Sequence, residues 1–370
     1  MKTRPYVFVT LNVYWFGLGF MWNALHPIVL PALLLNLVPA GLKNTYLGAM
    51  TFVGLVLAMG VQPLAGALSD RTRGPWGRRR PWMVAGTLAS LIVLGLMAGA
   101  RTLGQLVAGY VILQIVSNTA HGPAQGLIPD RIPPAHRGLA SGVKNLFGMG
   151  GLIATSLVAG RLMEGSSPGL AFLIIGAVLA VAAAITIFTI PPMYAVGPRT
   201  SSATSAESLI DRLCPALGRY PAYAKLLLAR FLILLGVYVV QSFAQYYIRD
   251  WLELPRPAVV TGNLMAAIGV ALTVLVFPAG WLSDRIGRWV LNVVAGAIAA
   301  AGIFLLVPVR GVVGLYAAGA MIGMATGVFL SVNWALATDL IPQEEAGKYL
   351  GLSNLATAGA GAASRFGGPI

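Results

Sequence analysis

The chain has 370 residues, of which 57% are hydrophobic and 10% are charged, whereas a soluble domain usually carries about 25% charged residues. So few charges cannot cover a soluble fold, and the composition predicts an integral membrane protein. The formal net charge of +14 comes from Lys and Arg between apolar stretches, where they set orientation in a membrane, so we expect no nucleic-acid partner. The one cysteine, Cys214, excludes a disulfide or a cysteine metal cluster within the chain, and we expect neither a metal nor a cofactor.

Apolar stretches long enough to cross a membrane recur along the whole chain. A hydrocarbon core of about 30 Å needs about 20 mostly apolar residues per helix. The first stretch follows Lys2 and Arg4 but has no small-residue cleavage site at its end, so we interpret it as a spanning helix and not as a signal peptide. The eleven predicted spans are residues 8–38, 46–68, 81–100, 103–127, 140–162, 169–190, 223–248, 258–279, 289–309, 311–338 and 349–363.

The longest polar interruption, with a Ser-rich stretch over residues 200–208, is typical of a linker. It predicts an N-terminal transmembrane bundle over 1–190, a linker over 191–222 and a C-terminal bundle over 223–370. Most of the 25 Lys and Arg residues fall on the side of the N-terminus and the linker. Because basic residues are retained in the cytoplasm, we expect a multi-pass monomer in the cell (plasma) membrane, with the N-terminus and linker cytoplasmic.

Two pairs of segments repeat in the same order. Residues 66–71 (GALSDR) match residues 280–285 (GWLSDR), and residues 130–133 (DRIP) match residues 339–342 (DLIP). Many transporters are built from such internal repeats. We therefore expect an all-α membrane protein of two six-helix-type bundles related by a pseudo-two-fold axis. By the same offset, the partner of the sixth helix falls after Ile370, so we expect the twelfth helix to be missing.

At these residues the sequence resembles the major facilitator superfamily. The long loop Ser69–Pro81 (SDRTRGPWGRRRP) and residues 246–250 (YYIRD) are similar to its sucrose-transporter and glycoside-pentoside-hexuronide cation symporter branch. The resemblance implies transport by alternating access, a cavity lined by helices 1, 4, 7 and 10, and a cytoplasmic gate of paired charges. A competing interpretation is that these charges only fix topology. The expected gate residues are Asp70, Arg71, Arg78, Asp130, Arg137, Asp284, Arg285, Arg288 and Asp339.

Polar residues on the helices expected to line the cavity follow helical spacing. On the fourth helix, Gln114, Asn118, His121 and Gln125 fall at i, i+4, i+7 and i+11, along one face. Such a stripe should face the bundle interior, although amides also join helix to helix. Trp15 and Gln125, near helix ends, are the least expected to contact solute. The candidate solute-binding residues are Trp22, Asn23, His26, Gln114, Asn118, His121, Tyr238, Gln241, Gln245 and Asn333.

Amides beside aromatic rings suit the hydroxyls and ring faces of a sugar or glycoside, so we expect a carrier of a small polar solute. The alternative is efflux of amphipathic, drug-like compounds. We expect no enzyme, because no convergent nucleophile or metal cluster is visible. Arg230, inside the seventh predicted helix, should reach toward the cytoplasmic surface; the alternative is that it neutralises an anionic solute.

The coupling ion is left open between a proton, sodium and none. All eleven acidic residues fall in loops or at helix ends, whereas ion-coupled carriers usually keep a carboxylate at membrane depth. This pattern favours facilitated diffusion or proton coupling through His26 and His121, since the ordinary histidine pKa of about 6.5 suits proton exchange near neutral pH.

Overall fold

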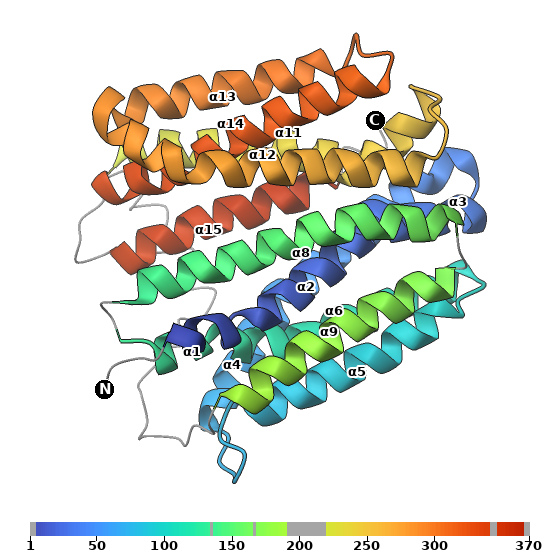
Figure 1. Cartoon of the computed structure of the whole chain (residues 1–370), viewed down its shortest axis with the longest axis vertical. Helices are drawn as coiled ribbons and strands as arrows, with labels where there is room; N and C mark the ends of the chain where they lie inside the picture. Colours follow the sequence, from blue (N-terminus) through green and yellow to red (C-terminus); the bar gives the residue numbers. More distant parts are fainter. Residues whose placement is uncertain (1–4, 134–135, 166–167, 191–219, 341–345, 366–370) are drawn as a thin grey trace. The chain divides into compact units, whose positions relative to one another are not determined.

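The structure is a computed structural model that describes residues 5–133, 136–165, 168–190, 220–340 and 346–365, and Figure 1 shows that its regular elements are helices. They are α1 (Pro5–Thr10), α2 (Val13–Ala24), the π-helix η1 (Leu25–Val29), α3 (Leu30–Leu37), the short 3-10 helix η2 (Ala40–Leu42), α4 (Lys43–Arg71), α5 (Arg80–Ala98), α6 (Leu103–Gln125), α7 (Leu127–Arg131), α8 (Arg137–Gly165), α9 (Pro168–Thr189), α11 (Pro221–Asp250), α12 (Pro257–Ile286), α13 (Arg288–Leu305), α14 (Val312–Asp339) and α15 (Ala346–Ala363).

The all-helical membrane fold predicted from the sequence is confirmed. Within the described residues, ten helical stretches are long and apolar enough to cross a membrane. Helix α15 occupies the place of the eleventh predicted span, although it is not one of these ten. The first predicted span is not one regular helix, because η1 separates α2 from α3.

Residues at the helix ends explain where several helices begin. Thr102 accepts a hydrogen bond from the backbone N–H of Gln105, whose side chain accepts from the backbone of Thr102 in return. This reciprocal capping box starts α6. Gly287 joins α12 to α13 with a φ of 101°, a conformation that glycine adopts without steric cost.

The described helices fall into two compact units. Unit 1 contains the described residues within 1–196, 242–269 and 365–370, and unit 2 contains those within 197–241 and 270–364. Unit 1 therefore includes the end of α11 and the start of α12. The predicted division at 191–222 lies largely outside the described residues and stays a prediction.

In unit 1, α2 packs against α8 and α9, α4 packs against α6, and α5 packs against α6 and α9 (Figure 1). Glycines allow these close approaches. A Cβ at Gly86 would lie 2.7 Å from the Val116 carbonyl oxygen, and one at Gly151 would lie 2.7 Å from the Phe20 nitrogen. Helix pairs in membranes depend on such small residues, because backbones must approach closely to gain packing energy.

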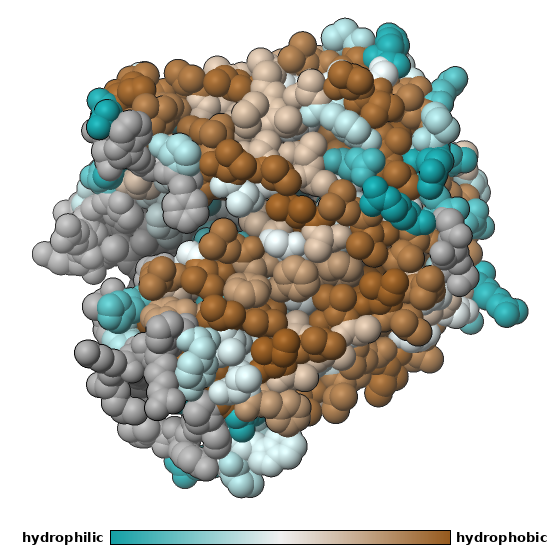
Figure 2. Space-filling view, in the orientation of Figure 1, coloured by the Kyte–Doolittle hydropathy of each residue, from teal (hydrophilic) through white to brown (hydrophobic). Residues whose placement is uncertain are grey.

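In unit 2, α13 packs against α14, and α14 contacts α15. The outer sides of the helices in both units are apolar: Phe188 on α9 is 81% exposed and Val313 on α14 is 84% exposed. Figure 2 shows hydrophobic residues along the helices and hydrophilic residues gathered near helix ends. This is the surface expected for helices whose solvent is lipid.

Candidate functional site

The π-helix η1 interrupts the first spanning helix at Pro27. Pro31 has no N–H to donate to the Pro27 carbonyl four residues earlier. Gln245, buried on α11, supplies the missing donor: its amide, oriented to suit its neighbours, donates to the carbonyls of Pro27 (3.1 Å) and Ile28 (2.9 Å). Single π turns are common at functional sites, and this one places His26 beside a cavity.

The cavity lies within unit 1 and has a volume of about 150 Å³. An engineered cavity of about this volume holds benzene, so the space is sufficient for one six-membered ring. Its walls come from the first spanning helix, α4, α6 and Arg365 just after α15, and carry amide, imidazole, indole, hydroxyl and guanidinium groups. The lining residues are Trp22, His26, Thr51, Leu55, Ala58, Gln62, Gln114, Asn118, His121 and Arg365.

Hydrogen bonds connect the polar side chains of α4 and α6. Gln125 Nε2 donates to Gln62 Oε1 (3.0 Å), and Gln62 Nε2 donates to Asn118 Oδ1 (2.6 Å). Asn118 Nδ2 in turn donates to Gln114 Oε1 at 3.0 Å and to the Gln114 carbonyl at 2.7 Å. Gln62 and Asn118 therefore each accept from one neighbour and donate to the next, which satisfies groups that would be costly to bury alone.

The same series continues to the first spanning helix. Gln114 Nε2 donates to Tyr110 Oη (2.7 Å), which lies 3.0 Å from His26 Nε2. Because the Tyr110 oxygen accepts from Gln114, its hydroxyl hydrogen is available for His26. We call this connected set the polar chain; its members are Gln125, Gln62, Asn118, Gln114, Tyr110 and His26.

Aromatic rings flank the two histidines of the cavity. The Trp22 ring stacks on His26 with centroids 5.1 Å apart and an angle of 20°. The Trp15 ring meets His121 edge to face at 5.0 Å, and Lys144 Nζ lies 3.8 Å from the Trp15 ring centroid. Trp15 thus contacts a cavity residue but is not one of the residues that line this cavity.

Five of the ten predicted solute-binding residues line this cavity: Trp22, His26, Gln114, Asn118 and His121. Asn23 instead donates to the Gly19 carbonyl of its own helix (2.7 Å), and Gln245 holds η1. Sequence reasoning missed Gln62 and Tyr110. Tyr110 stands four residues before Gln114 and extends the same helical stripe, whereas Gln62 is the one amide of the apolar stretch 46–68 and gives no periodic signal.

The remaining predicted binding residues, Tyr238, Gln241 and Asn333, belong to unit 2. Asn333 is 1% exposed; its Oδ1 accepts from Arg230 Nη1 (2.8 Å) and its Nδ2 donates to Asn292 Oδ1 (3.3 Å). The expectation that Arg230 reaches a surface is wrong. Arg230 is 6% exposed, because Asn333 on α14 and Thr357 on α15 hold its guanidinium inside the unit.

A cluster of four charges, Asp70, Arg78, Arg79 and Asp130, joins the end of α4 to the start of α5 and to α7. Arg78 Nη2 lies 2.5 Å from Asp130 Oδ1, and Arg79 Nε donates to Asp130 Oδ2 at 3.0 Å. Arg79 Nη2 also reaches Asp70 Oδ1 at 2.6 Å. The structure thus brings together three predicted gate residues and adds Arg79, which the Arg78–Arg80 run gave no reason to single out. We call these four residues the charge cluster.

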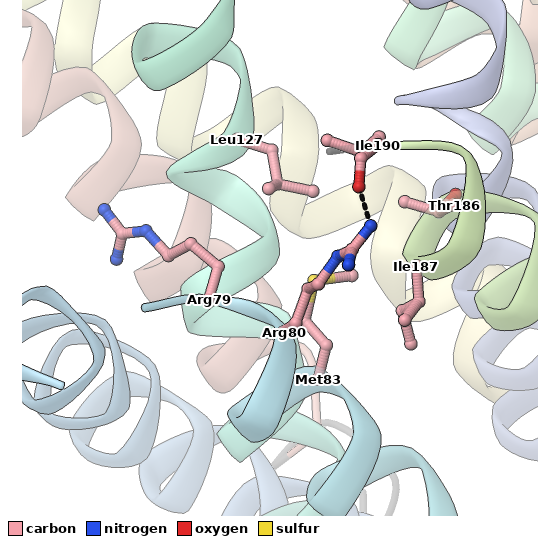
Figure 3. Close-up of a pocket in the computed structure, with 7 residues that line it drawn as sticks. All are labelled: Arg79, Arg80, Met83, Leu127, Thr186, Ile187 and Ile190. Atoms are coloured by element: carbon pink, nitrogen blue, oxygen red, sulfur yellow. Dashed lines mark hydrogen bonds between the residues drawn. The ribbon is translucent and has the colours of Figure 1, made fainter. Parts of the chain in front are cut away.

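Beside the charge cluster, Arg79 and Arg80 diverge from the start of α5. Figure 3 shows Arg80 directed to the Ile190 carbonyl, to which it donates, while Arg79 points away from that carbonyl. The space between them, which Met83 and Ile187 also line, measures about 10 Å³. That is no more than one water molecule requires, so it has no room for a solute.

The other described gate residues are more exposed and make fewer ion pairs than the charge cluster. In unit 2, Arg288 Nη1 lies 2.7 Å from Asp339 Oδ1, and these side chains are 33% and 50% exposed. Arg71 is exposed and makes no ion pair within the described part of the chain, and Arg285 is also exposed. The side chains of Arg137 and Asp284 lie outside the described residues.

A second set of ionic contacts lies at the opposite ends of the unit 1 helices. Lys43, at the start of α4, pairs with Asp250 at the end of α11. Glu164, at the end of α8, accepts from the backbone N–H of Ala258 (2.6 Å) at the start of α12 and from Arg256 (3.3 Å). A carboxylate at a helix N-terminus is favourable because the first N–H groups lack partners. No sequence pattern predicted these contacts.

The sequence model of the Major Facilitator Superfamily matches residues 7–364. The chain belongs to this superfamily. Its members are transporters and not enzymes, so the carrier fold and the predicted absence of catalysis are confirmed.

The curated relatives of this superfamily member are distant. The sucrose transport protein SUC4 of Arabidopsis thaliana is 31% identical over 106 residues, which is 24% of this chain and 21% of that protein. The proton-associated sugar transporter A of Homo sapiens is 26% identical over 200 residues, 48% of this chain and 26% of that protein. The multi-drug resistance efflux pump PmrA of Streptococcus pneumoniae serotype 4 is 24% identical over 292 residues, 77% of this chain and 69% of that protein.

Solved superfamily structures share the fold over nearly the whole chain. A bacterial homolog of the human lysosomal transporter Spinster, inward-facing and unoccupied, superposes with a TM-score of 0.73 at 17% identity, covering 99% of this chain and 83% of that one. A D-xylose-proton symporter gives a TM-score of 0.71 at 16% identity, covering 99% and 90%. At these identities the likeness shows the fold alone.

Proposed function

We propose that this superfamily member carries a sugar or glycoside across the membrane by alternating access. The observation that carries the proposal is the unit 1 cavity, where the polar chain presents amide, imidazole and hydroxyl groups next to Trp22. Amides offer both donors and acceptors, which matches the paired donor and acceptor character of sugar hydroxyls, and an aromatic face packs against a sugar ring. The matches to sucrose and proton-associated sugar transporters support the same class.

Within this proposal the charge cluster acts as the gate on the cytoplasmic side. Its carboxylates and guanidinia connect three helices in one network of ion pairs. In unit 2, the ion pair between Arg288 and Asp339 is the equivalent contact and involves two residues. Such pairs favour one state of a two-state carrier and separate in the other, so their strength sets the balance between states. The orientation, with N-terminus and linker in the cytoplasm of the plasma membrane, rests on the distribution of Lys and Arg.

The decisive experiment is uptake of radiolabelled mono- and disaccharides by proteoliposomes that contain the purified chain. Asn118→Ala removes an amide at the centre of the polar chain and should reduce uptake by at least about tenfold, as expected when hydrogen bonds to a solute are lost. Thr119→Ala is the matched control, because Thr119 is one residue away, is only half-buried and donates to the Ile115 carbonyl of its own helix. Equal uptake by both variants would contradict the cavity assignment.

Coupling is proposed to pass through His26 or His121, both of which line the cavity. Sugar accumulation driven by an imposed pH gradient should fall in His26→Gln or His121→Gln. His136→Gln is the control, since the third histidine is exposed at the start of α8. Accumulation that survives both cavity substitutions eliminates histidine coupling, and equilibration without accumulation in the unmodified protein indicates a uniporter.

A second candidate function is efflux of amphipathic compounds. It is favoured by the match to PmrA, which covers 77% of this chain and 69% of that protein. Expression in a drug-sensitive host distinguishes the two: an efflux pump raises the tolerated drug concentration, whereas a sugar carrier restores growth on its carbon source and leaves drug tolerance unchanged.

A further inference from the structure

A basic side chain lies close to each histidine of the unit 1 cavity. Arg365 belongs to unit 1 and lines the cavity, and its charge acts electrostatically on His26. Lys144, half-buried on α8, lies over the Trp15 ring, which in turn meets His121. The Lys144 charge also acts on His121. Because a charged group inside a spanning helix is costly, it usually serves a function.

The carboxylates of unit 1 lie away from this cavity. Five described residues of the unit carry one, and all of them lie near helix ends or in a loop: Asp70, Asp130, Glu164, Asp250 and Glu253. None of them is among the described residues that line the cavity. A solute in the cavity therefore meets amides, hydroxyls, aromatic rings and a guanidinium, and the described lining residues offer no acidic group to bind a positive charge.

The aromatic rings near the cavity do not replace a carboxylate as a cation site. The face of an indole ring attracts cations, but the Trp15 ring already holds the Lys144 ammonium, 3.8 Å from its centroid. One face of Trp22 is covered by the stacked His26 ring, with centroids 5.1 Å apart. A cationic solute would therefore approach two fixed positive charges and gain little from these rings in return.

We propose that Arg365 and Lys144 make the cavity reject positively charged solutes. Like charges repel strongly at short range where the protein excludes water, and a site gains specificity from groups that disfavour the wrong solute. The proposal rests on the transport function proposed above and refines its substrate class to sugars and glycosides without a positive charge, which excludes protonated amino sugars. Arg365 is the specificity-determining residue of the cavity wall, and Lys144 adds to the same positive potential from behind Trp15.

The test compares sugars that differ in one group. Purified full-length protein is titrated calorimetrically with glucose and glucosamine, and with galactose and galactosamine, at a pH at which the amine is protonated and again at a pH at which it is neutral. The variants are Arg365→Gln, Arg365→Lys and Lys144→Gln. Arg161→Gln is the matched control, because Arg161 is an exposed arginine of unit 1 that donates to the Leu157 carbonyl of its own helix.

We expect the unmodified protein to bind at least one neutral sugar about tenfold or more tightly than its protonated amino derivative, as repulsion between close charges predicts. This difference in affinity should persist in Arg365→Lys and Arg161→Gln and should disappear when the amine is neutral. Arg365→Gln and Lys144→Gln should each reduce it, Arg365→Gln more strongly because Arg365 lines the cavity. Should Arg365→Gln fail to fold, Lys144→Gln provides the test on its own.

Four results overturn the proposal. Equal affinity for each sugar and its protonated amino derivative removes the role of both charges but leaves the sugar carrier intact. A difference that persists in Arg365→Gln, or in Lys144→Gln when the other variant does not fold, assigns it to other residues. A difference that also closes in Arg161→Gln assigns it to the net charge of the protein. A difference that remains when the amine is neutral assigns it to the missing hydroxyl. Failure of the proposed transport function is separate, because then none of the sugars binds or enters proteoliposomes.

Discussion

Substitution of Asp130 by asparagine should destabilise the protein far more than the same change at Asp70. The Asp130 side chain is 3% exposed and contacts both Arg78 and Arg79, whose side chains are 14% and 8% exposed. Asp130→Asn would leave these two buried cations with Asp70 as their common counter-charge. Breaking a buried ion pair from one side costs about 3–5 kcal/mol, whereas Asp70, at 43% exposure, is screened and should contribute about 1 kcal/mol or less.

The assay is thermal unfolding of the purified full-length protein in one detergent. The unfolding entropy expected for 370 residues is about 0.8 kcal/mol per kelvin. Asp130→Asn should therefore lower the midpoint by roughly 4–6 °C and Asp70→Asn by about 1 °C. Glu253→Gln, at an exposed loop carboxylate, should leave it unchanged. Equal losses for the Asp70 and Asp130 variants would refute the reasoning that burial sets the strength of this cluster.

Other changes test the cavity, the π-helix and the helix packing. Tyr110→Phe removes the hydroxyl between two members of the polar chain and should cost about 1–3 kcal/mol in denaturant unfolding; no change would mean that the hydroxyl is dispensable. Gln245→Ala leaves the Pro27 carbonyl without its donor. It should destabilise the protein by a similar amount and increase the rate of amide hydrogen exchange around η1. Unaltered exchange would contradict the hydrogen bond from Gln245. Gly151→Val places carbon atoms against the Phe16 backbone and should lower the free energy of unfolding by about 1–3 kcal/mol or more. An unchanged free energy of unfolding would mean that α8 can shift to admit the side chain.

Hydropathy was sufficient to place the spanning helices, because a backbone in hydrocarbon must satisfy its hydrogen bonds within each segment. It could not reveal the break in the first span. Pro27 and Pro31 are visible in the sequence, but a proline in a spanning helix is compatible with a kink, a π turn or a regular helix. The donor that stabilises this break is Gln245, and no local pattern connects residues so far apart.

Helical period identified Gln114, Asn118 and His121 as one cavity face, because all three lie on the same helix and share its geometry. It could not give the role of Gln245. The spacing of this residue on α11 suited a stripe that lines a cavity, but its amide donates to backbone carbonyls of η1. Nor could it find Arg79, since three consecutive arginines point in different directions once α5 begins. Which side chain turns inward depends on the position of Asp130 on another helix.

The contacts that hold η1 have a consequence for biogenesis. Tyr246, next to Gln245, donates to the Pro31 carbonyl at 3.2 Å across a sequence separation of 215 residues. At about 5–20 residues per second, the ribosome needs roughly 10–40 s to make that intervening stretch. During this interval the first helix is already at the membrane and its Pro27 carbonyl lacks the Gln245 donor, so water or the insertion machinery must solvate that carbonyl until the seventh predicted span arrives. A ribosome stall in the linker region would prolong that exposure, and degradation of nascent chains should then increase in proportion to the length of the stall.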